Sequence, residues 1–430
     1  MDEATKRMAE AIAPERIEQK SAARIAHDRP IPRVTIHVHV IHPETRQVIE
    51  EVAADRRFSK AHITVFDGGI QGAAQHYTEA PTPSLILVED VSRADKVFAN
   101  LQALANVCDP GSKVMVIGRE NDVSFYRDLM RQGVNEYLVG PLSVMQVIDA
   151  ISALYVDPSG PPIGRLFAFT AARGGAGSST IAHNIGWCIA EELDEDVTLV
   201  DLDLPFGTAG LDFNQDSLQG VADALGSPER LDDTMLERLL LKCTGHLSLF
   251  SSPGTLEREL ELDPAGCERV IDVVRQSVPC VIMDLPHLWS PWKRHLMIAA
   301  DEVIITATPD LASLRNTKNF IDLLKLARPN DVAPRVILNQ VGVPRRPEIS
   351  EKDFAEAIGT EVVAAIGFEP QLFGTASNNG QMIPELSPHS RVAQGIRDIA
   401  RVLTGREVPV VKTDPLRAAL AQLKSKLGTK

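Results

Sequence analysis

Long apolar runs and cysteines are scarce in this chain of 430 residues. No stretch of about 18 consecutive apolar residues is present, so the sequence predicts no membrane-spanning helix, and no apolar core near residue 1 resembles a signal peptide. The cysteines are scattered, without the paired spacing of a metal site: Cys108, Cys188, Cys243, Cys267 and Cys280. We therefore expect a cytoplasmic protein whose cysteines are small buried residues kept reduced.

Positive charge is also in deficit. The chain has 44 lysines and arginines against 58 aspartates and glutamates, a formal net charge of −14. Non-specific binding to DNA depends on neutralising phosphates with cations, so this balance argues against a nucleic-acid partner. A hydrophobic fraction of 44% and a charged fraction of 24% are ordinary for a soluble globular protein. The length allows about two or three domains.

A glycine-rich segment at residues 165–180, RLFAFTAARGGAGSST, predicts a buried strand, a tight turn and then a helix. Glycines let successive backbone N–H groups converge on a phosphate, and the helix N-terminus adds partial positive charge. We expect phosphate to bind along this loop: Gly174, Gly175, Ala176, Gly177, Ser178, Ser179 and Thr180. The hydroxyl of Ser179 is placed to ligate Mg²⁺, but Ser178 replaces the lysine that usually precedes this hydroxyl and neutralises the phosphates.

The loop resembles the deviant Walker A motif, Lys-Gly-Gly-x-x-Lys-[Ser/Thr], of the ParA/MinD ATPase superfamily. Arg173 stands at the first lysine of that motif and Ser178 at the second. Later segments follow the family's order and spacing: residues 197–207, 281–286, 301–315 and 336–342. Within the superfamily, the likeness is to the TadZ/CpaE proteins of Tad (Flp) pilus assembly, which join a degenerate receiver domain to a MinD-like domain.

The resemblance implies a fold and a reactive site. The fold is α/β, with a flavodoxin-like atypical receiver domain followed by a doubly wound, mostly parallel P-loop NTPase domain. The implied cofactors are ATP and Mg²⁺, and the implied metal residues are Ser179, Asp201 and Asp284. The implied catalytic residues are Asp203 and Arg173, the latter reaching the partner's site across a dimer.

A base pocket is implied by the same resemblance. Asn339 falls where the family reads adenine, and its amide has both a donor and an acceptor for the base. Residues 367–381, GFEPQLFGTASNNGQ, resemble the loop and helix that close over the base in the family. Gly367 and Phe368 replace the usual Ile-Pro in that loop, which weakens the expectation of strict adenine selectivity.

Residues 32–155 alternate short apolar strands with helical stretches, and the expected strands are residues 34–41, 63–66, 85–88, 113–117 and 136–139. The segment resembles a response-regulator receiver that lacks the receiver's chemistry. Residues 36–40, IHVHV, lack the acidic pair that holds Mg²⁺, and Glu89 takes the place of the phosphoacceptor aspartate. Gly118 replaces the switch hydroxyl and Gly140 the lysine. We expect a docking module, with Asp90 as the alternative acceptor if phosphotransfer occurs.

The expected organisation has five parts. They are a mobile N-terminal tail (1–31), the receiver-like domain (32–156), a proline-containing linker (157–162), the MinD/ParA-like ATPase domain (163–408) and a C-terminal tail (409–430). The last part contains a predicted amphipathic helix over residues 414–430, with leucines on one face: Leu416, Leu420, Leu423 and Leu427. This helix is either a peripheral membrane contact or a protein contact.

We therefore expect an ATP-binding localisation and assembly factor for Tad (Flp) pilus biogenesis. It would form a nucleotide-dependent homodimer with weak or absent hydrolysis, bind other Tad components such as a secretion ATPase or polar hub, and lie at the cell pole or the inner face of the inner membrane. One alternative is an active MinD/ParA-class ATPase whose cycling positions the protein. The other is a nucleotide-free scaffold, because Arg173 and Ser178 replace both motif lysines.

Overall fold

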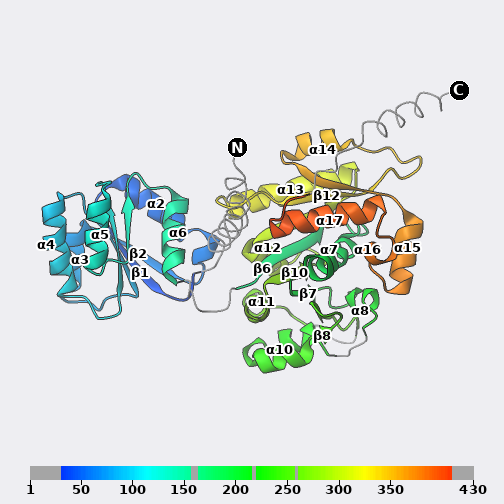
Figure 1. Cartoon of the computed structure of the whole chain (residues 1–430), viewed down its shortest axis with the longest axis horizontal. Helices are drawn as coiled ribbons and strands as arrows, with labels where there is room; N and C mark the ends of the chain where they lie inside the picture. Colours follow the sequence, from blue (N-terminus) through cyan, green and yellow to red (C-terminus); the bar gives the residue numbers. More distant parts are fainter. Residues whose placement is uncertain (1–30, 156–162, 216–218, 257–259, 409–430) are drawn as a thin grey trace, which may run out of the picture.

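The computed structural model describes residues 31–155, 163–215, 219–256 and 260–408, which form two α/β units, each built on its own sheet (Figure 1). The expected linker, the C-terminal helix and residues 1–30 of the expected N-terminal tail lie outside these ranges. Within the described residues, no helix combines the length and apolarity needed to cross a membrane.

The first sheet is five-stranded and parallel throughout, in the order β2-β1-β3-β4-β5. Its strands are β1 (Thr35–Val40), β2 (His62–Asp67), β3 (Leu85–Glu89), β4 (Lys113–Gly118) and β5 (Glu136–Val139). This is the strand order of flavodoxin-like doubly wound sheets. The strands expected from the sequence are confirmed to within one residue at each end.

Helices cover both faces of the first sheet, because apolar side chains emerge on both sides of its strands. α2 (Pro43–Ala53) and α6 (Val144–Tyr155) pack on the face that carries Ile36 and Val38. α3 (Gly69–His76), α4 (Ala94–Ala105) and α5 (Val123–Arg131) pack on the face that carries Ile86 and Val88. A short 3-10 turn, η1 (Arg56–Phe58), follows α2.

Over the described residues, the second sheet is eight-stranded, in the order β13-β12-β11-β6-β10-β7-β9-β8, and only the pair β8 and β9 is antiparallel. Its strands are β6 (Arg165–Ala171), β7 (Val197–Asp201), β8 (Leu241–Lys242), β9 (Leu247–Phe250), β10 (Cys280–Asp284), β11 (Glu302–Ala307), β12 (Arg335–Val341) and β13 (Val362–Gly367). The glycine loop leaves β6, which lies between β10 and β11 in the middle of the sheet. In sheets of this kind, ligands bind beyond the carboxyl ends of the strands.

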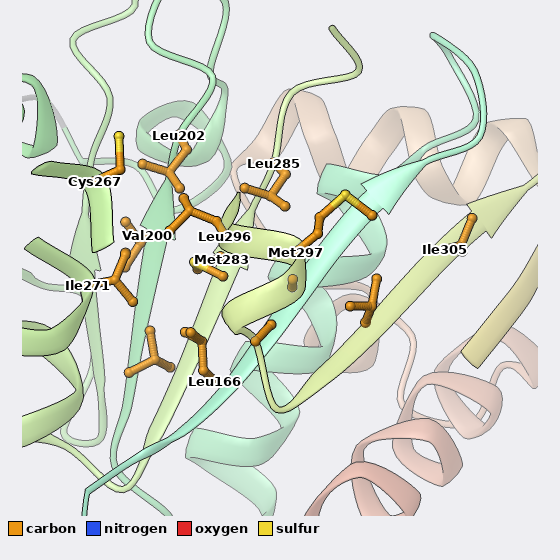
Figure 2. Packing of buried hydrophobic residues seen from close by; sticks show 14 of the residues in the cluster. Leu166, Val200, Leu202, Cys267, Ile271, Met283, Leu285, Leu296, Met297 and Ile305 are labelled. Atoms are coloured by element: carbon orange, nitrogen blue, oxygen red, sulfur yellow. The ribbon is translucent and has the colours of Figure 1, made fainter. Parts of the chain in front are cut away.

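Two layers of helices enclose this sheet. One layer contains α9 (Val221–Leu225), α10 (Asp233–Leu239), α11 (Pro264–Ser277), α12 (Pro291–Ala299), α13 (Leu311–Ala327) and α14 (Glu351–Ile358), with the 3-10 turn η2 (Pro228–Arg230). The other contains α7 (Ser178–Leu193), α8 (Ala209–Asp212), α15 (Pro370–Asn379), α16 (Ile383–Leu386) and α17 (Arg391–Thr404). Figure 2 shows the first layer's core, where Leu296 and Met297 of α12 pack with Leu166 and Met283 of the strands.

A buried ion-pair cluster joins the two α/β units. Asp331, just after α13, accepts hydrogen bonds from Arg56 Nε and Arg57 Nη2 of η1, both at 2.6 Å, and from Arg328 Nε at 2.8 Å. All four side chains are at least 94% buried. Burial opposes ionisation, but the charges of Arg56, Arg328 and Arg57 outweigh it and hold the pKa of Asp331 well below its usual range.

Replacing Asp331 by asparagine should lower the free energy of unfolding by about 3 to 5 kcal/mol, because three buried guanidinium groups lose the carboxylate that they share. Asp301 stays 3.8 Å from Arg56 and Asp55 stays 3.3 Å from Arg57, so these two arginines keep a more distant or less direct partner. The matched control is Asp322→Asn on α13, where Asp322 pairs with Lys318 on an exposed face and should contribute at most about 0.5 kcal/mol. Urea denaturation measures both. Equal losses in the two variants at pH 7 would contradict this account of the cluster.

The stability difference between wild type and Asp331→Asn should also depend on pH. Because the folded-state pKa of Asp331 is depressed, its stabilisation is present above the ordinary aspartate value of 3.8 and is lost as pH falls through the folded value. The difference between wild type and Asp331→Asn should therefore be smaller at pH 3 than at pH 7.

Candidate functional site

The glycine loop connects the end of β6 to the first turn of α7. Gly175 and Gly177 have φ values of 77° and 87°, in the left-handed region that favours glycine. A Cβ at Gly177 would also lie 2.5 Å from Nδ2 of Asn339, so glycine is required there by space as well. No side chain among the described residues caps α7. Its first N–H groups and its positive dipole end are therefore available to an anion.

Two side chains of β12 hold the loop from one side. Asn339 Nδ2 donates to the carbonyl of Ala176, and Gln340 Nε2 donates to the carbonyl of Gly175, each at 2.8 Å. These bonds engage the carbonyl groups of the loop and leave the loop amides for another partner. Asn339 is buried and already uses one of its donors here. Its expected contact with adenine stays a prediction.

The serines that follow the loop differ in exposure. Ser178 is buried, and its Oγ has no hydrogen-bond partner in the described part of the chain. Ser179 and Thr180 are partly exposed at the start of α7. The position that lacks the motif lysine is therefore an uncharged, inward-facing hydroxyl, while the hydroxyl expected near Mg²⁺ lies closer to the surface.

Two acidic side chains end neighbouring strands beside the loop. Asp201 of β7 and Asp284 of β10 are register partners, and both are buried. Asp201 accepts hydrogen bonds from Ser252 Oγ at 3.0 Å and from the amide of Asp203 at 3.1 Å. Burial, together with the charge of Asp284, raises the pKa of Asp201 to about 7. Burial likewise raises the pKa of Asp203, which is only partly buried.

The acidic pair suits a cation supplied together with a phosphate ligand. Both oxygens of Asp201 already accept protein donors, whereas Oδ1 of Asp284 is buried without a hydrogen-bond partner among the described residues. Over the same residues, no three His, Cys, Asp or Glu side chains form a metal cluster. Mg²⁺ commonly binds through one or two carboxylates, water and substrate phosphates, so this donor set fits it. The assignment of Ser179, Asp201 and Asp284 as metal residues stays a prediction.

A histidine that the sequence reasoning missed lies against this pair. His183 of α7 is fully buried, with Nδ1 2.7 Å from Asp212 Oδ2 of α8 and Nε2 3.4 Å from Asp284 Oδ2. Burial alone would lower the pKa of His183, but its hydrogen bond to Asp212 and the charges of Asp284 and Asp212 outweigh burial and raise the pKa to about 10. The two carboxylates therefore favour the protonated form of His183, which links α8 to β10. Only its place among apolar neighbours in the helix hinted that it was buried.

A lysine was missed as well. Lys293 of α12 is fully buried, and its Nζ donates to the carbonyl of Pro286 at 2.6 Å, in the loop that follows Asp284. Lys293 is within electrostatic range of Asp284 and Asp203, so Asp284 interacts with positive charge from both α7 and α12.

Arg173 lies on the outer side of the loop. Its side chain is about half exposed, and Nη1 donates to Asp310 Oδ2 at 3.3 Å. Asp310 is in turn the N-cap of α13, where it accepts from the amide of Ser313 at 2.9 Å. Arg173 is therefore held on one side and accessible on the other, as a residue acting on a partner subunit must be.

Replacing His183 by leucine should lower the free energy of unfolding by about 3 to 5 kcal/mol, because the carboxylates of Asp212 and Asp284 lose their buried cation. His246→Leu is the control, since His246 pairs with Asp196 at 2.8 Å on the surface and should change stability little. Urea denaturation of both variants measures the difference. A leucine variant as stable as wild type would show that His183 carries no such charge.

Comparisons with known proteins show what this chain is similar to. Residues 165–327 match the family described as cellulose biosynthesis protein BcsQ. A MinD septum site-determining protein from Thermotoga maritima is 23% identical over 255 residues, covering 58% of this chain and 91% of the relative. The solved MinD from Pyrococcus horikoshii, described as complexed with Mg-ADP, is 20% identical with a TM-score of 0.50, covers 56% of this chain and 96% of its own, and shows a shared fold.

A third relative is much closer in sequence. The solved pilus assembly protein CpaE from Caulobacter crescentus is 51% identical, with 30% of this chain and 98% of that chain covered and a TM-score of 0.30 over the pair. An identity of this size over nearly all of the relative is decisive by sequence alone. The chain belongs to the CpaE-type pilus assembly proteins of the ParA/MinD ATPase superfamily.

Proposed function

We propose that this protein is an ATP-binding localisation and assembly factor of Tad-type pilus biogenesis, working as a nucleotide-dependent homodimer. The observation that carries nucleotide binding is the uncapped N-terminus of α7, reached through two left-handed glycines from the central strand β6. The pilus role rests on the likeness to CpaE, and the cofactors on relatives such as the MinD solved with Mg-ADP.

The chain's own groups have distinct proposed roles. The amides of residues 174–180 bind the phosphates, and the dipole of α7 adds to their positive potential. Ser179 and Asp284 hold Mg²⁺, supported by Asp201, and the bound ion offsets the charge of the phosphates. Asp203 is the proposed group beside the attacking water, and Asn339 is the proposed contact of the adenine ring.

Hydrolysis is proposed to be weak or absent. Charge that develops on the transferred phosphoryl group must be met by cations already in place, and one missing contact of this kind costs about 10²-fold or more. Ser178 supplies only a neutral hydroxyl at the position of the motif lysine. Arg173 keeps positive charge and an exposed face, and a guanidinium grips phosphate oxygens in a fork. The site is thus suited to holding a dimer around a nucleotide more than to turning it over.

The first sheet unit is proposed to be a receiver-like docking module without phosphotransfer. Its strand-end acid, Glu89, accepts hydrogen bonds from the amides of Ile41 and His42, from Thr45 Oγ1 and from His42 Nδ1. Its carboxylate is therefore committed within the protein. The proposed domain limits are 32–156 and 163–408, and the proposed partners are a second copy of the chain and other pilus assembly components. The proposed location is cytoplasmic, at a cell pole or beneath the inner membrane.

Titration of the full chain with a fluorescent ATP analogue and Mg²⁺, together with a phosphate-release assay, tests the proposal. We expect saturable binding with little or no phosphate released. Sustained release would favour the actively cycling ATPase, and a chain that binds no analogue would favour the nucleotide-free scaffold. An excess of unlabelled ATP should displace the analogue, which separates binding at the site from adsorption.

Arg173→Ala should leave the fold intact and weaken dimer formation in ATP, because the variant loses the cation proposed to reach the partner's phosphates. Sedimentation velocity with and without ATP measures the dimer. Arg315→Ala is the matched control, since Arg315 is an exposed arginine that hydrogen-bonds its neighbour Asn316. If Arg173→Ala still dimerised as wild type does, the proposed role across the dimer would be wrong.

A further inference from the structure

The ammonium group of Lys293 is buried inside the second α/β unit, which is an unfavourable place for a charge. The side chain of Lys293 has no exposed surface, although a charged group taken out of water carries a large desolvation cost. Its Nζ donates to the carbonyls of Pro286 and His287, at 2.6 and 3.4 Å, and lies 5.6 Å from the ring centroid of Phe320. An apolar residue would fill this place in α12 without that cost.

Lys293 lies near the glycine loop and near two of the acids beside it. Burial lowers the pKa of Lys293 to about 8, while the carboxylates of Asp284 and Asp203 act against that fall. The two carboxylates therefore favour the ammonium form of the side chain. The loop that Lys293 holds also lies close to the glycine loop, because a Cβ added to Gly174 would lie 3.6 Å from His287 Cδ2. The charge of Lys293 is therefore held at residues 286 and 287, within electrostatic range of Asp284 and Asp203.

We propose that Lys293 is a positioning residue for the polyphosphate, standing in for the lysine that is missing at Ser178. Its ammonium offsets the negative charge of Asp284, at the end of β10, and of Asp203, two residues after β7, so that the polyphosphate does not meet that charge alone. Its bonds to residues 286 and 287 hold their loop against the glycine loop. Because Lys293 is buried, it acts through its field and through these carbonyls, without touching the nucleotide. This inference rests on the proposed nucleotide binding.

Arg173 and His183 are not placed to act on the polyphosphate in this way. Arg173 lies on the outer side of the loop and pairs with Asp310. His183 is bound between Asp212 and Asp284 on the α7 side of the sheet. Lys293 approaches from α12, on the opposite face, and its hydrogen bonds go to backbone carbonyls, so its charge is not cancelled by a bonded carboxylate.

The test is a double-mutant cycle between Lys293 and Ser178 in the full chain. The proteins are wild type, Lys293→Met, Ser178→Lys and the double variant, each titrated with fluorescent ATP and AMP analogues and Mg²⁺ at pH 7. Lys293→Met should bind the ATP analogue about ten-fold or more weakly and the AMP analogue nearly unchanged, because the effect scales with phosphate charge. Ser178→Lys should improve ATP binding more in the Lys293→Met background than in wild type, since the new ammonium takes over the lost charge.

Two controls separate charge from folding. Lys318→Met removes an exposed lysine that pairs with Asp322 on α13 and should leave both affinities unchanged. Lys293→Gln keeps a hydrogen-bond donor without the charge. It replaces the methionine variant if urea denaturation shows that the methionine variant is not folded. It should show the same selective loss for ATP.

The outcomes are distinguishable. Equal loss of ATP and AMP binding, or no rescue by Ser178→Lys, would reduce Lys293 to a structural role and overturn the inference. A folded, uncharged variant that binds ATP as tightly as wild type would do the same while leaving the proposed function standing. If wild type binds no ATP analogue, the proposed function fails and this inference fails with it.

Discussion

Two buried aspartates at adjacent strand ends set the constraint on which the rest of this site depends. Asp201 and Asp284 are register partners on β7 and β10, and like charges so placed in a low-dielectric interior repel strongly. The protein offsets that repulsion with a hydroxyl from Ser252 and with two buried cations, His183 and Lys293. His183 belongs to α7 on one face of the sheet, and Lys293 belongs to α12 on the other. Helices from both faces therefore contribute positive charge to the acidic pair at the carboxyl ends of the strands.

The glycine loop beside these acids depends on its backbone more than on its side chains. Left-handed Gly175 and Gly177 set its path, and the amides of Asn339 and Gln340 hold two of its carbonyls. Backbone N–H groups persist whatever the side chain, so the loop keeps an anion-binding shape although Ser178 has replaced a lysine. The lost charge affects how strongly a polyphosphate is held and how well its reaction is stabilised, which are separate demands on the site.

Two helices extend from this site to the junction with the first α/β unit. α12 begins just after the loop that Lys293 holds, and the carbonyl of Ala299 at its other end accepts from Arg56 Nη1. α13 is capped by Asp310, the partner of Arg173, and is followed by the buried Asp331. The ion pairs of the junction and the charges of the site are therefore anchored on the same two elements.

The sequence alone determined what depends on local pattern. Alternating apolar runs predicted the five strands of the first sheet, and the spacing of glycines and serines predicted the strand, loop and helix at residues 165–180, because backbone conformation there follows from residue type. Tertiary structure decided what depends on distant partners. Residue type alone did not indicate that His183 and Lys293 lie buried at this site, since their carboxylate and carbonyl partners come from other parts of the chain. Asp331 likewise meets Arg57 only after both units have folded, because ion pairing depends on separation in space and not along the chain.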